Sequence, residues 1–344
     1  MMLKKLGVVG ALAGVCFTAA SAMAETVTIK YSNWMPANYF AWTDVIQPWF
    51  AEIEQVTEGR VKIDILPKVV GTAASQFDVV RDGLADMAWF TAGFTPGRFP
   101  VSEFADLPLV SNSASIHAPI YDRVYRKHLA DFNEYEGTQV LTIFPISPSQ
   151  MFIRGKTVKT LEDLRGLKFR SPGNTVIAAV ELLGGVPITK APTEAYEMLS
   201  SGAIDGQITP GSSVVGFNQV DLTDSAYLLP GGLSNAICMI LINDAVWARI
   251  SEADRAAIQA ISQDKLAAKF GAAWENKDKE ALEVLSANPK YTIVEATDED
   301  VAKLREILKP LEEAWVKRAK EKGFANPEAI LADYRAQLAE AQPK

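Results

Sequence analysis

Few residues in this chain could act as nucleophiles or metal ligands. Beyond the first 24 residues, the sequence holds two histidines, His117 and His128, and a single cysteine, Cys238. Zinc sites and Ser-His-Asp triads need such side chains in groups. The two histidines flank a charged stretch, IHAPIYDRVYRKHL, which favours solvated surface positions. Cys238 lies in the apolar run 236–242, which predicts a buried, inert thiol. We expect neither a metal site nor a cofactor.

Asp86 and Asp205 are candidate acids with matching surroundings. Each follows a helix-ending glycine, Gly83 or Gly202, at the same distance and precedes a predicted strand. In that setting, hydrogen bonding to a turn is the ordinary role of an aspartate. The repeated spacing also suggests two similar halves of the chain. A hydrolase remains an alternative, although neither a G-x-G-x-x-G loop nor a phosphate loop occurs.

One arginine, Arg170, has a setting that suits ligand binding. It ends the stretch GLKFR, residues 166–170, in which Leu167 and Phe169 would lie on the buried face of a strand, and a rigid Ser-Pro-Gly turn follows it. A planar guanidinium group can bind a carboxylate through two parallel hydrogen bonds. Taken alone, however, the stretch favours a solvated arginine beside Lys168.

Four aromatic residues fall at or just after predicted strand ends: Trp34, Trp89, Phe90 and Phe94. In open α/β sheets, the loops that follow the strands face the ligand. Core packing is the alternative for each residue taken singly. Their shared placement favours an aromatic wall around a bound molecule.

The first 24 residues have the pattern of a secretory signal peptide. Lys4 and Lys5 precede an apolar run, and Ala22-Met23-Ala24 forms a cleavage site of the A-x-A type. Without this segment and its two lysines, the net charge of −8 becomes −10. An acidic chain without a basic cluster argues against binding to nucleic acid. No later apolar run approaches the roughly 18 residues that span a bilayer, so we expect no direct membrane insertion.

Alternating strands and helices predict an α/β fold with parallel layers. Strands are expected at 27–31, 61–66, 86–90, 140–144, 151–154, 167–170, 186–188 and 204–208. From Ser251 the pattern becomes helical, with Leu266, Phe270 and Trp274 spaced on one face. This helix could exceed roughly 30 residues, long enough to brace two lobes.

Several motifs resemble those of DctP-type solute-binding proteins of tripartite ATP-independent periplasmic (TRAP) transporters. They are VTEGRVKIDILP (56–67), VVRDGLADMAW (79–89), TLEDLRGLKFRSPGN (160–174) and YEMLSSGAIDGQITP (196–210). The resemblance implies an α/β fold of the two-lobe, type II-like periplasmic binding class, with crossing strands and a long lobe-spanning helix. We accordingly assign the chain as signal peptide (1–24), mainly lobe 1 with later segments returning to it (25–144), mainly lobe 2 (145–240), and lobe-spanning and C-terminal helices (241–344).

The same resemblance implies a function without catalysis. Such a protein captures a small organic acid in the periplasm and delivers it to TRAP permease membrane subunits of the DctQ and DctM type, for uptake driven by an ion gradient. Arg170 matches the arginine of the family's GLK-x-R motif, which grips the ligand carboxylate. The other candidate contacts are Gln150 and Thr209 for hydrogen bonds, Trp34, Trp89 and Phe90 for an apolar wall, and Arg154 for a second positive charge.

Two departures from the family pattern limit the ligand. Sialic-acid binders carry a second arginine where this chain has Gln150, and an asparagine where it has Thr209. The less cationic site disfavours sialic acid and weakens the case for a dicarboxylate. We expect a monocarboxylate, and an aromatic acid suits the predicted wall better than a short hydroxy acid. A 2-oxo or hydroxy acid held through a cation at Gln150, a ligand sensor, and an enzyme on the same fold remain alternatives.

Overall fold

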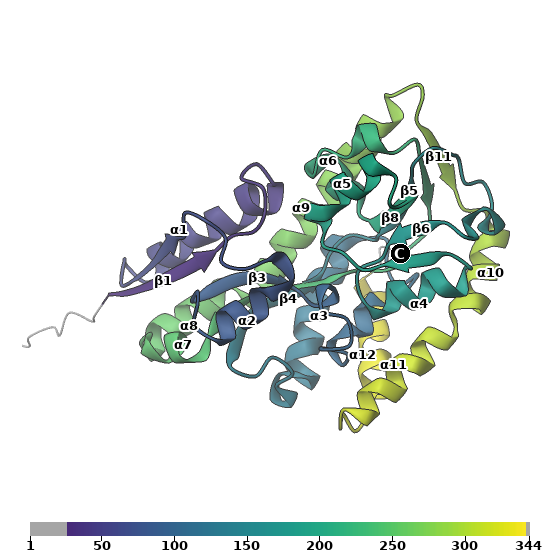
Figure 1. Cartoon of the computed structure of the whole chain (residues 1–344). Helices are drawn as coiled ribbons and strands as arrows, with labels where there is room; N and C mark the ends of the chain where they lie inside the picture. Colours follow the sequence, from purple (N-terminus) through teal and green to yellow (C-terminus); the bar gives the residue numbers. More distant parts are fainter. Residues whose placement is uncertain (1–25, 342–344) are drawn as a thin grey trace, which may run out of the picture.

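The computed structural model describes residues 26–341 and folds them into two α/β lobes (Figure 1). Each lobe is built on one sheet, flanked by helices. The expected two-lobe architecture is therefore confirmed. The signal peptide expected over residues 1–24 lies outside the described residues.

The first sheet has the strand order β2-β1-β3-β10-β4. Its first three strands pair in parallel, whereas β10 runs antiparallel to both β3 and β4. The strands are β1 (Val27–Ser32), β2 (Val61–Ile65), β3 (Met87–Thr91), β4 (Thr138–Pro145) and β10 (Ile237–Asn243). The helices packed around this lobe are α1 (Gln47–Val56), α2 (Gln76–Arg81), α3 (Ala114–His128), α7 (Asp244–Arg249) and α8 (Glu252–Ile261).

The second sheet has the strand order β11-β9-β5-β8-β6-β7. Its strands are β5 (Gln150–Ile153), β6 (Lys168–Arg170), β7 (Val186–Ile188), β8 (Gly206–Thr209), β9 (Ser225–Leu228) and β11 (Thr292–Glu295). The helices of this part of the chain are α4 (Asn174–Leu182), α5 (Pro192–Ser201) and α6 (Gly211–Gly216). The C-terminal helices are α10 (Asp298–Leu308), α11 (Pro310–Glu321) and α12 (Pro327–Ala341), of which α10 and α11 contact α4 and α12 contacts α3.

The two sheets share one topology. The series β7-β6-β8-β5-β9 repeats the pattern of β2-β1-β3-β10-β4, because β5 is antiparallel to its two neighbours just as β10 is. The paired aspartates occupy equivalent places in it. Asp86 Oδ2 accepts a hydrogen bond from the Lys30 backbone N–H at 2.8 Å, and Asp205 Oδ2 accepts one from the Lys168 N–H at 2.8 Å. Both aspartates thus hydrogen-bond to the backbone, but to a neighbouring strand and not to a turn as expected.

Two connecting segments, 146–149 and 229–236, cross between the sheets and pair with each other through Ser149 and Ser234. The crossing places β10 in the first sheet, although most of this strand falls in the range assigned mainly to lobe 2. Similarly, β11 joins the second sheet from a range that we expected to be helical.

The helical stretch that begins at Ser251 forms two helices end to end, α8 and α9 (Gln263–Ser286), instead of one. The chain leaves the helical region at Ser262, with ψ −146°, and Gln263 has φ 53°. Ser262 Oγ accepts a hydrogen bond from Trp49 Nε1 at 3.2 Å, which fixes the break against the first lobe. In Figure 1, α9 runs from α8 toward α6, and it contacts α3 and β4 of the first lobe as well as α6 and β11 of the second. The expected brace between lobes is present.

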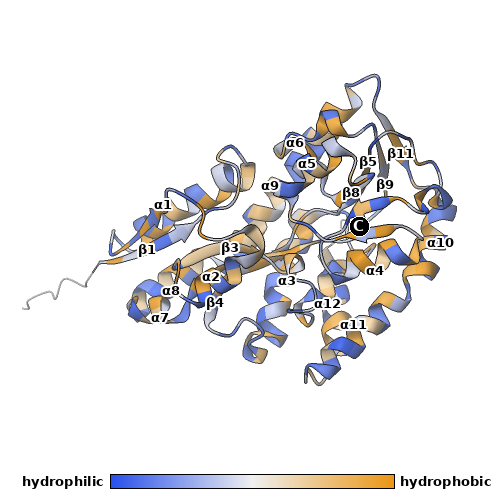
Figure 2. Ribbon diagram, in the orientation of Figure 1, coloured by the Kyte–Doolittle hydropathy of each residue, from blue (hydrophilic) through white to orange (hydrophobic). Residues whose placement is uncertain are grey.

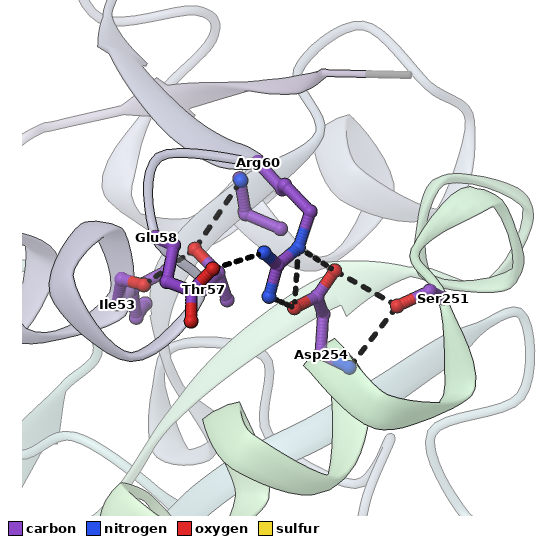
Figure 3. A network of polar contacts seen from close by, with 7 residues as sticks. Ile53, Thr57, Glu58, Arg60, Ser251 and Asp254 are labelled. Atoms are coloured by element: carbon purple, nitrogen blue, oxygen red, sulfur yellow. Dashed lines mark hydrogen bonds and ion pairs between the residues drawn. The ribbon is translucent and has the colours of Figure 1, made fainter. Parts of the chain in front are cut away.

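A network of charges ties the start of α8 to the first lobe (Figure 3). Arg60 Nη2 lies 2.8 Å from Asp254 Oδ1, and this contact lowers the pKa of the Asp254 carboxyl. The Asp254 N–H donates to Ser251 Oγ at 3.1 Å, and Ser251 Oγ donates back to Asp254 Oδ2 at 2.8 Å. The helix start expected at Ser251 is therefore capped and anchored.

Strand β3 separates two clusters of core side chains. Figure 2 shows its apolar character, and all five residues are buried. Side chains alternate across a strand. Trp89 accordingly packs against Phe144 and Phe270 on one face, while Phe90 packs against Phe77 and Phe99 on the other. Only the face that carries Trp89 looks toward the site described below.

Candidate ligand-binding site

Arg170 is held at the end of β6 by local structure on both sides. Phe169 is buried in the core of the lobe, so Arg170 projects from the opposite face of the strand. The following turn is fixed by two hydrogen bonds, from Ser171 N–H to Ile188 O at 2.9 Å and from Ser171 Oγ to Phe169 O at 3.0 Å. Gly173, with φ +89°, then lets the chain enter α4.

The Arg170 side chain is a buried cation that makes no direct ion pair, although the more distant Glu194 carboxylate attracts it. It is 2% exposed, and its Nε donates to the Lys190 carbonyl oxygen at 2.8 Å. Within residues 26–341, no carboxylate oxygen lies within 4.0 Å of its guanidinium group, and its two terminal nitrogens make no hydrogen bond. Burial lowers the pKa of Arg170 to about 10. A buried charge is expensive unless it is paired, so this group is suited to receive an anion.

Arg170 lies on the wall of a small cavity, about 50 Å³ in volume, between the lobes. Its apolar wall combines five aromatic residues with aliphatic side chains and prolines. The aromatic residues are Trp34, Trp89, Phe94, Phe217 and Trp274, and the others are Met35, Ile146, Pro172, Pro192, Ile208, Pro210 and Ala236. Besides Arg170, the polar side chains on the wall are Tyr39, Thr91, Ser149, Thr209 and Ser213. No Asp, Glu, Lys or second Arg of the described residues lines it. One positive charge in a mostly apolar enclosure suits a small monoanion.

Close contacts between the lobes border the cavity. Gly93, which follows β3, lies against Gly173 so closely that a Cβ atom on Gly93 would sit 3.3 Å from the Gly173 Cα. Another close contact joins Tyr39 to α6. Tyr39 Oη and Ser213 Oγ are 3.4 Å apart, and a Cβ atom added to Gly216 would lie 2.7 Å from the Tyr39 ring. The lobes therefore meet around the cavity in the structure.

Four of the predicted site residues line this cavity: Arg170, Thr209, Trp34 and Trp89. Trp34 is half-buried and packs edge-on against Phe94, with ring centroids 5.8 Å apart. Trp89 is 2% exposed, so it belongs to the core as well as to the cavity wall. Thr209 ends β8, the strand next to β6, which brings it close to Arg170.

The other three predicted residues lie elsewhere. Phe90 points to the opposite face of β3, as the alternation of the strand requires. The Gln150 side chain is engaged with the backbone of Leu229, donating to its carbonyl oxygen at 3.0 Å and accepting from its N–H at 2.7 Å. Arg154 lies exposed beyond the end of β5. None of these side chains lines the cavity.

Sequence reasoning missed several wall residues: Tyr39, Thr91, Ser149, Ser213, Phe217 and Trp274. Trp274 was visible only as part of a core stripe on a helix, a pattern that does not show which end of the side chain faces a cavity. The remaining residues lie in loops, at the end of a strand or on the short helix α6 and its end, where no periodic pattern marks them.

The residues tested for catalytic chemistry have structural surroundings. Cys238 is buried on the wall of the cavity, and burial raises the pKa of its thiol to about 12. His117 was expected at the surface, but it is fully buried in α3 beside Tyr334 of α12. His128 is half-buried, with Nε2 2.7 Å from Asp333 Oδ2. Among residues 26–341, no group of three or more His, Cys, Asp or Glu side chains is placed to hold a metal ion.

A larger groove of about 1080 Å³ runs along α10, α11 and α12. Most of its charged residues pair with one another, as in the ion pairs of Arg335 with Glu312 and of Lys320 with Glu328. It thus lacks the uncompensated buried charge that distinguishes the cavity at Arg170.

Comparison with known proteins fits this geometry. The model of the bacterial extracellular solute-binding protein family 7, DctP, matches residues 32–318. The chain belongs to this family. TRAP solute-binding proteins of this kind bind small organic acids and work with membrane permeases. In the part of the chain that the structure covers, none of the helices is both long and apolar enough to cross a membrane.

Two solved structures resemble this DctP-family protein throughout. A TRAP periplasmic solute-binding protein of Bordetella bronchiseptica with bound (R)- and (S)-mandelate is 34% identical, with a TM-score of 0.88, and the match covers 92% of this chain and 100% of that one. A TRAP solute-binding protein of Rhodoferax ferrireducens with copurified benzoate is 26% identical, with a TM-score of 0.85, covering 92% and 98%. A relative named outer membrane transporter protein TsaT, from Comamonas testosteroni, is 29% identical over 296 residues, 86% of this chain and 87% of that protein.

Proposed function

We propose that this protein captures a small aromatic monocarboxylic acid in the periplasm and presents it to the membrane subunits of a TRAP permease. The observation that carries the proposal is Arg170, a buried cation without a direct ion pair on the wall of an otherwise uncharged, mostly apolar cavity that is rich in aromatic rings. The two terminal nitrogens of its guanidinium group would hold the two oxygens of the ligand carboxylate in parallel hydrogen bonds.

The rest of the cavity selects the body of the ligand. Trp34, Trp89 and Phe94 offer flat apolar surfaces on which an aromatic ring can stack. A second carboxylate would have no positive partner on the wall, which disfavours dicarboxylates. Mandelate and benzoate, the ligands of the two similar structures, are both monocarboxylates with one aromatic ring.

Ligand binding would favour the closed arrangement of the lobes. Arg170 and Thr209 belong to the second lobe, whereas Trp34 and Trp89 belong to the first, so only the closed form surrounds the ligand. A ligand shifts the population toward the state that it binds better. The permease would recognise this state and release the acid for uptake. Removal of the predicted signal peptide on export would place the protein in the periplasm.

The alternative of an acid held through a cation at Gln150 has less support. Both polar atoms of that side chain are occupied by the Leu229 backbone, and Gln150 does not line the cavity. A cation there would have to break both hydrogen bonds. The aromatic monocarboxylate is therefore the function that we advance.

A ligand screen tests the proposal. Native mass spectrometry of freshly purified protein would detect a copurified acid, and thermal melts would then compare benzoate, mandelate, succinate and glucose. A cognate acid at 100 times its Kd should stabilise the fold by about 2.7 kcal/mol, because only the folded cavity binds it. Benzoate or mandelate should raise the melting temperature more than succinate, and glucose should leave it unchanged. A shift with glucose and with no carboxylate would contradict the proposal.

A further inference from the structure

Three tryptophan side chains line the cavity, and their indole N–H groups differ in one respect. Trp34 Nε1 donates to the Trp89 carbonyl oxygen at 3.1 Å, and Trp89 Nε1 donates to Thr91 Oγ1 at 3.2 Å. Trp274 Nε1 is buried and has no hydrogen-bond partner among the described residues. A buried donor without an acceptor costs about 1–3 kcal/mol, so such groups are rare and call for an explanation.

The surroundings of Trp274 restrict where an acceptor could lie. The indole is enclosed by aromatic rings, namely Phe40, Trp89, Phe144 and Phe270, with ring centroids 4.8, 5.6, 6.2 and 6.1 Å away. Phenyl and indole rings offer no oxygen to accept a conventional hydrogen bond. Tyr39 also packs edge-on against the indole, with ring centroids 6.4 Å apart, and Trp274 lines the cavity. A ligand in the cavity could supply the acceptor that the phenyl and indole rings around this N–H do not.

Trp274 and Arg170 come from different parts of the fold. Arg170 ends β6 of the second lobe, whereas Trp274 lies on α9 and packs against Trp89 and Phe144 of the first lobe. A ligand held at its carboxylate by the second lobe would thus extend its other end toward the first lobe. Tyr39 Oη and Ser213 Oγ also belong to this wall and are 3.4 Å apart, a long separation for hydroxyl groups.

We propose that the Trp274 N–H donates a hydrogen bond to an oxygen substituent at the end of the ligand away from its carboxylate, so that the cavity prefers oxygen-substituted aromatic acids to unsubstituted ones. This inference rests on the proposed function and specifies its substrate class. A site that hydrogen-bonds a ligand group rejects the analogue without that group, because its buried polar atoms then stay unpaired. Trp274 is in this sense a residue that determines specificity.

The test compares pairs of acids by titration calorimetry. Benzoate is compared with 3- and 4-hydroxybenzoate, and phenylacetate with 4-hydroxyphenylacetate, on the wild type, Trp274→Phe and Trp34→Phe. Phenylalanine keeps an aromatic surface at position 274 and removes the donor. The wild type should bind the best hydroxylated acid at least about tenfold more tightly than its parent, and Trp274→Phe should lose most of this ratio. Trp34→Phe should keep the ratio, since the Trp34 N–H is already occupied within the protein.

The possible outcomes separate the two proposals. If the wild type binds no carboxylate, both the function and the inference fail. If it binds carboxylates but Trp274→Phe keeps the wild-type ratio, or weakens every acid by one factor, Trp274 only shapes the wall and the inference alone fails. Apo melts of each variant exclude loss of the fold, and Tyr39→Phe shows whether the phenol contributes to the same ratio.

Discussion

At the scale of single residues, the site depends on an arginine that the fold places where it is costly. Arg170 is buried, its Nε is used by the Lys190 carbonyl, and burial lowers its pKa to about 10. A protein selected for stability alone would place an apolar side chain there. The cost is understandable if the charge is neutralised by a ligand in the working state.

Replacing Arg170 with methionine should therefore separate binding from stability. Arg170→Met keeps much of the side-chain volume and should weaken binding of the cognate acid by about 2–5 kcal/mol, or roughly 30- to 5000-fold. The apo free energy of unfolding should stay the same or rise, because the desolvated charge is gone. Calorimetry and urea unfolding measure the two quantities.

Arg170→Lys is the matched control for charge. Lysine keeps the positive charge but offers a point donor on a flexible stem, so the pair of parallel hydrogen bonds is lost and little affinity should return. Equal dissociation constants in the wild type and both variants would remove Arg170 from the site.

At the scale of elements, the sequence pattern predicts the strands well. It does not predict where a helix is interrupted or which helix faces are covered by other elements. The alternation at 27–31 and the glycines before Asp86 and Asp205 predicted strands and turns correctly because these signals are local. The break at Ser262 carries no proline or glycine, and it depends on Trp49, more than 200 residues away in sequence. The motif predicts Arg170 as a ligand contact. Trp274 lies on an apolar helix stripe, and such a stripe predicts core packing, so the sequence does not identify this residue as part of the cavity wall.

Helix α3 shows the same limit. The charged stretch around His117 suggested a solvated surface, but α9, β4 and α12 pack against the helix. His117 is fully buried, and neither ring nitrogen has a partner among the described residues. Burial lowers its pKa to about 3, so the imidazole stays neutral in the folded protein.

This buried histidine should make the fold sensitive to acid. The unfolded chain takes up a proton at an ordinary histidine pKa of about 6.5, which the folded protein does not, so stability falls as pH drops below that value. Between pH 7.5 and pH 5, His117 should account for a loss of about 2 kcal/mol. His117→Phe should remove that part of the loss in urea unfolding at the two pH values. Tyr334→Phe, which changes a neighbouring side chain that does not titrate in this range, should retain it. An unchanged pH dependence in His117→Phe would contradict the assignment.

At the scale of the whole molecule, two sheets of one topology face each other across a cavity, and α9 and two crossing segments connect them. The close contacts that border the cavity depend on glycine residues, which have no side chain to occupy the space. Gly93 lies against Gly173, and Gly216 leaves room for the Tyr39 ring. Tyr39 in turn contacts Phe217 of the second lobe, with ring centroids 5.1 Å apart. The closed form is thus sterically demanding at a few glycine positions, whereas an open form would not be.

Gly216→Ala should therefore weaken binding without touching the ligand. A Cβ atom at this position would lie 2.7 Å from Tyr39 Cε2 in the closed form, and overpacking of this kind costs about 1–3 kcal/mol. If that cost falls on the closed state alone, affinity for the cognate acid should drop roughly 5- to 150-fold. The apo stability should not fall, because alanine is the better helix former and Gly216 lies in α6. Small-angle scattering should show less compaction on adding ligand than in the wild type.

A Tyr39→Ala background is the control for this prediction. The added methyl group then has no ring to clash with, so Gly216→Ala should change affinity little. If Gly216→Ala causes the same loss of affinity in the Tyr39→Ala background, or if the single variant binds with wild-type affinity, the contact between Gly216 and Tyr39 does not limit closure.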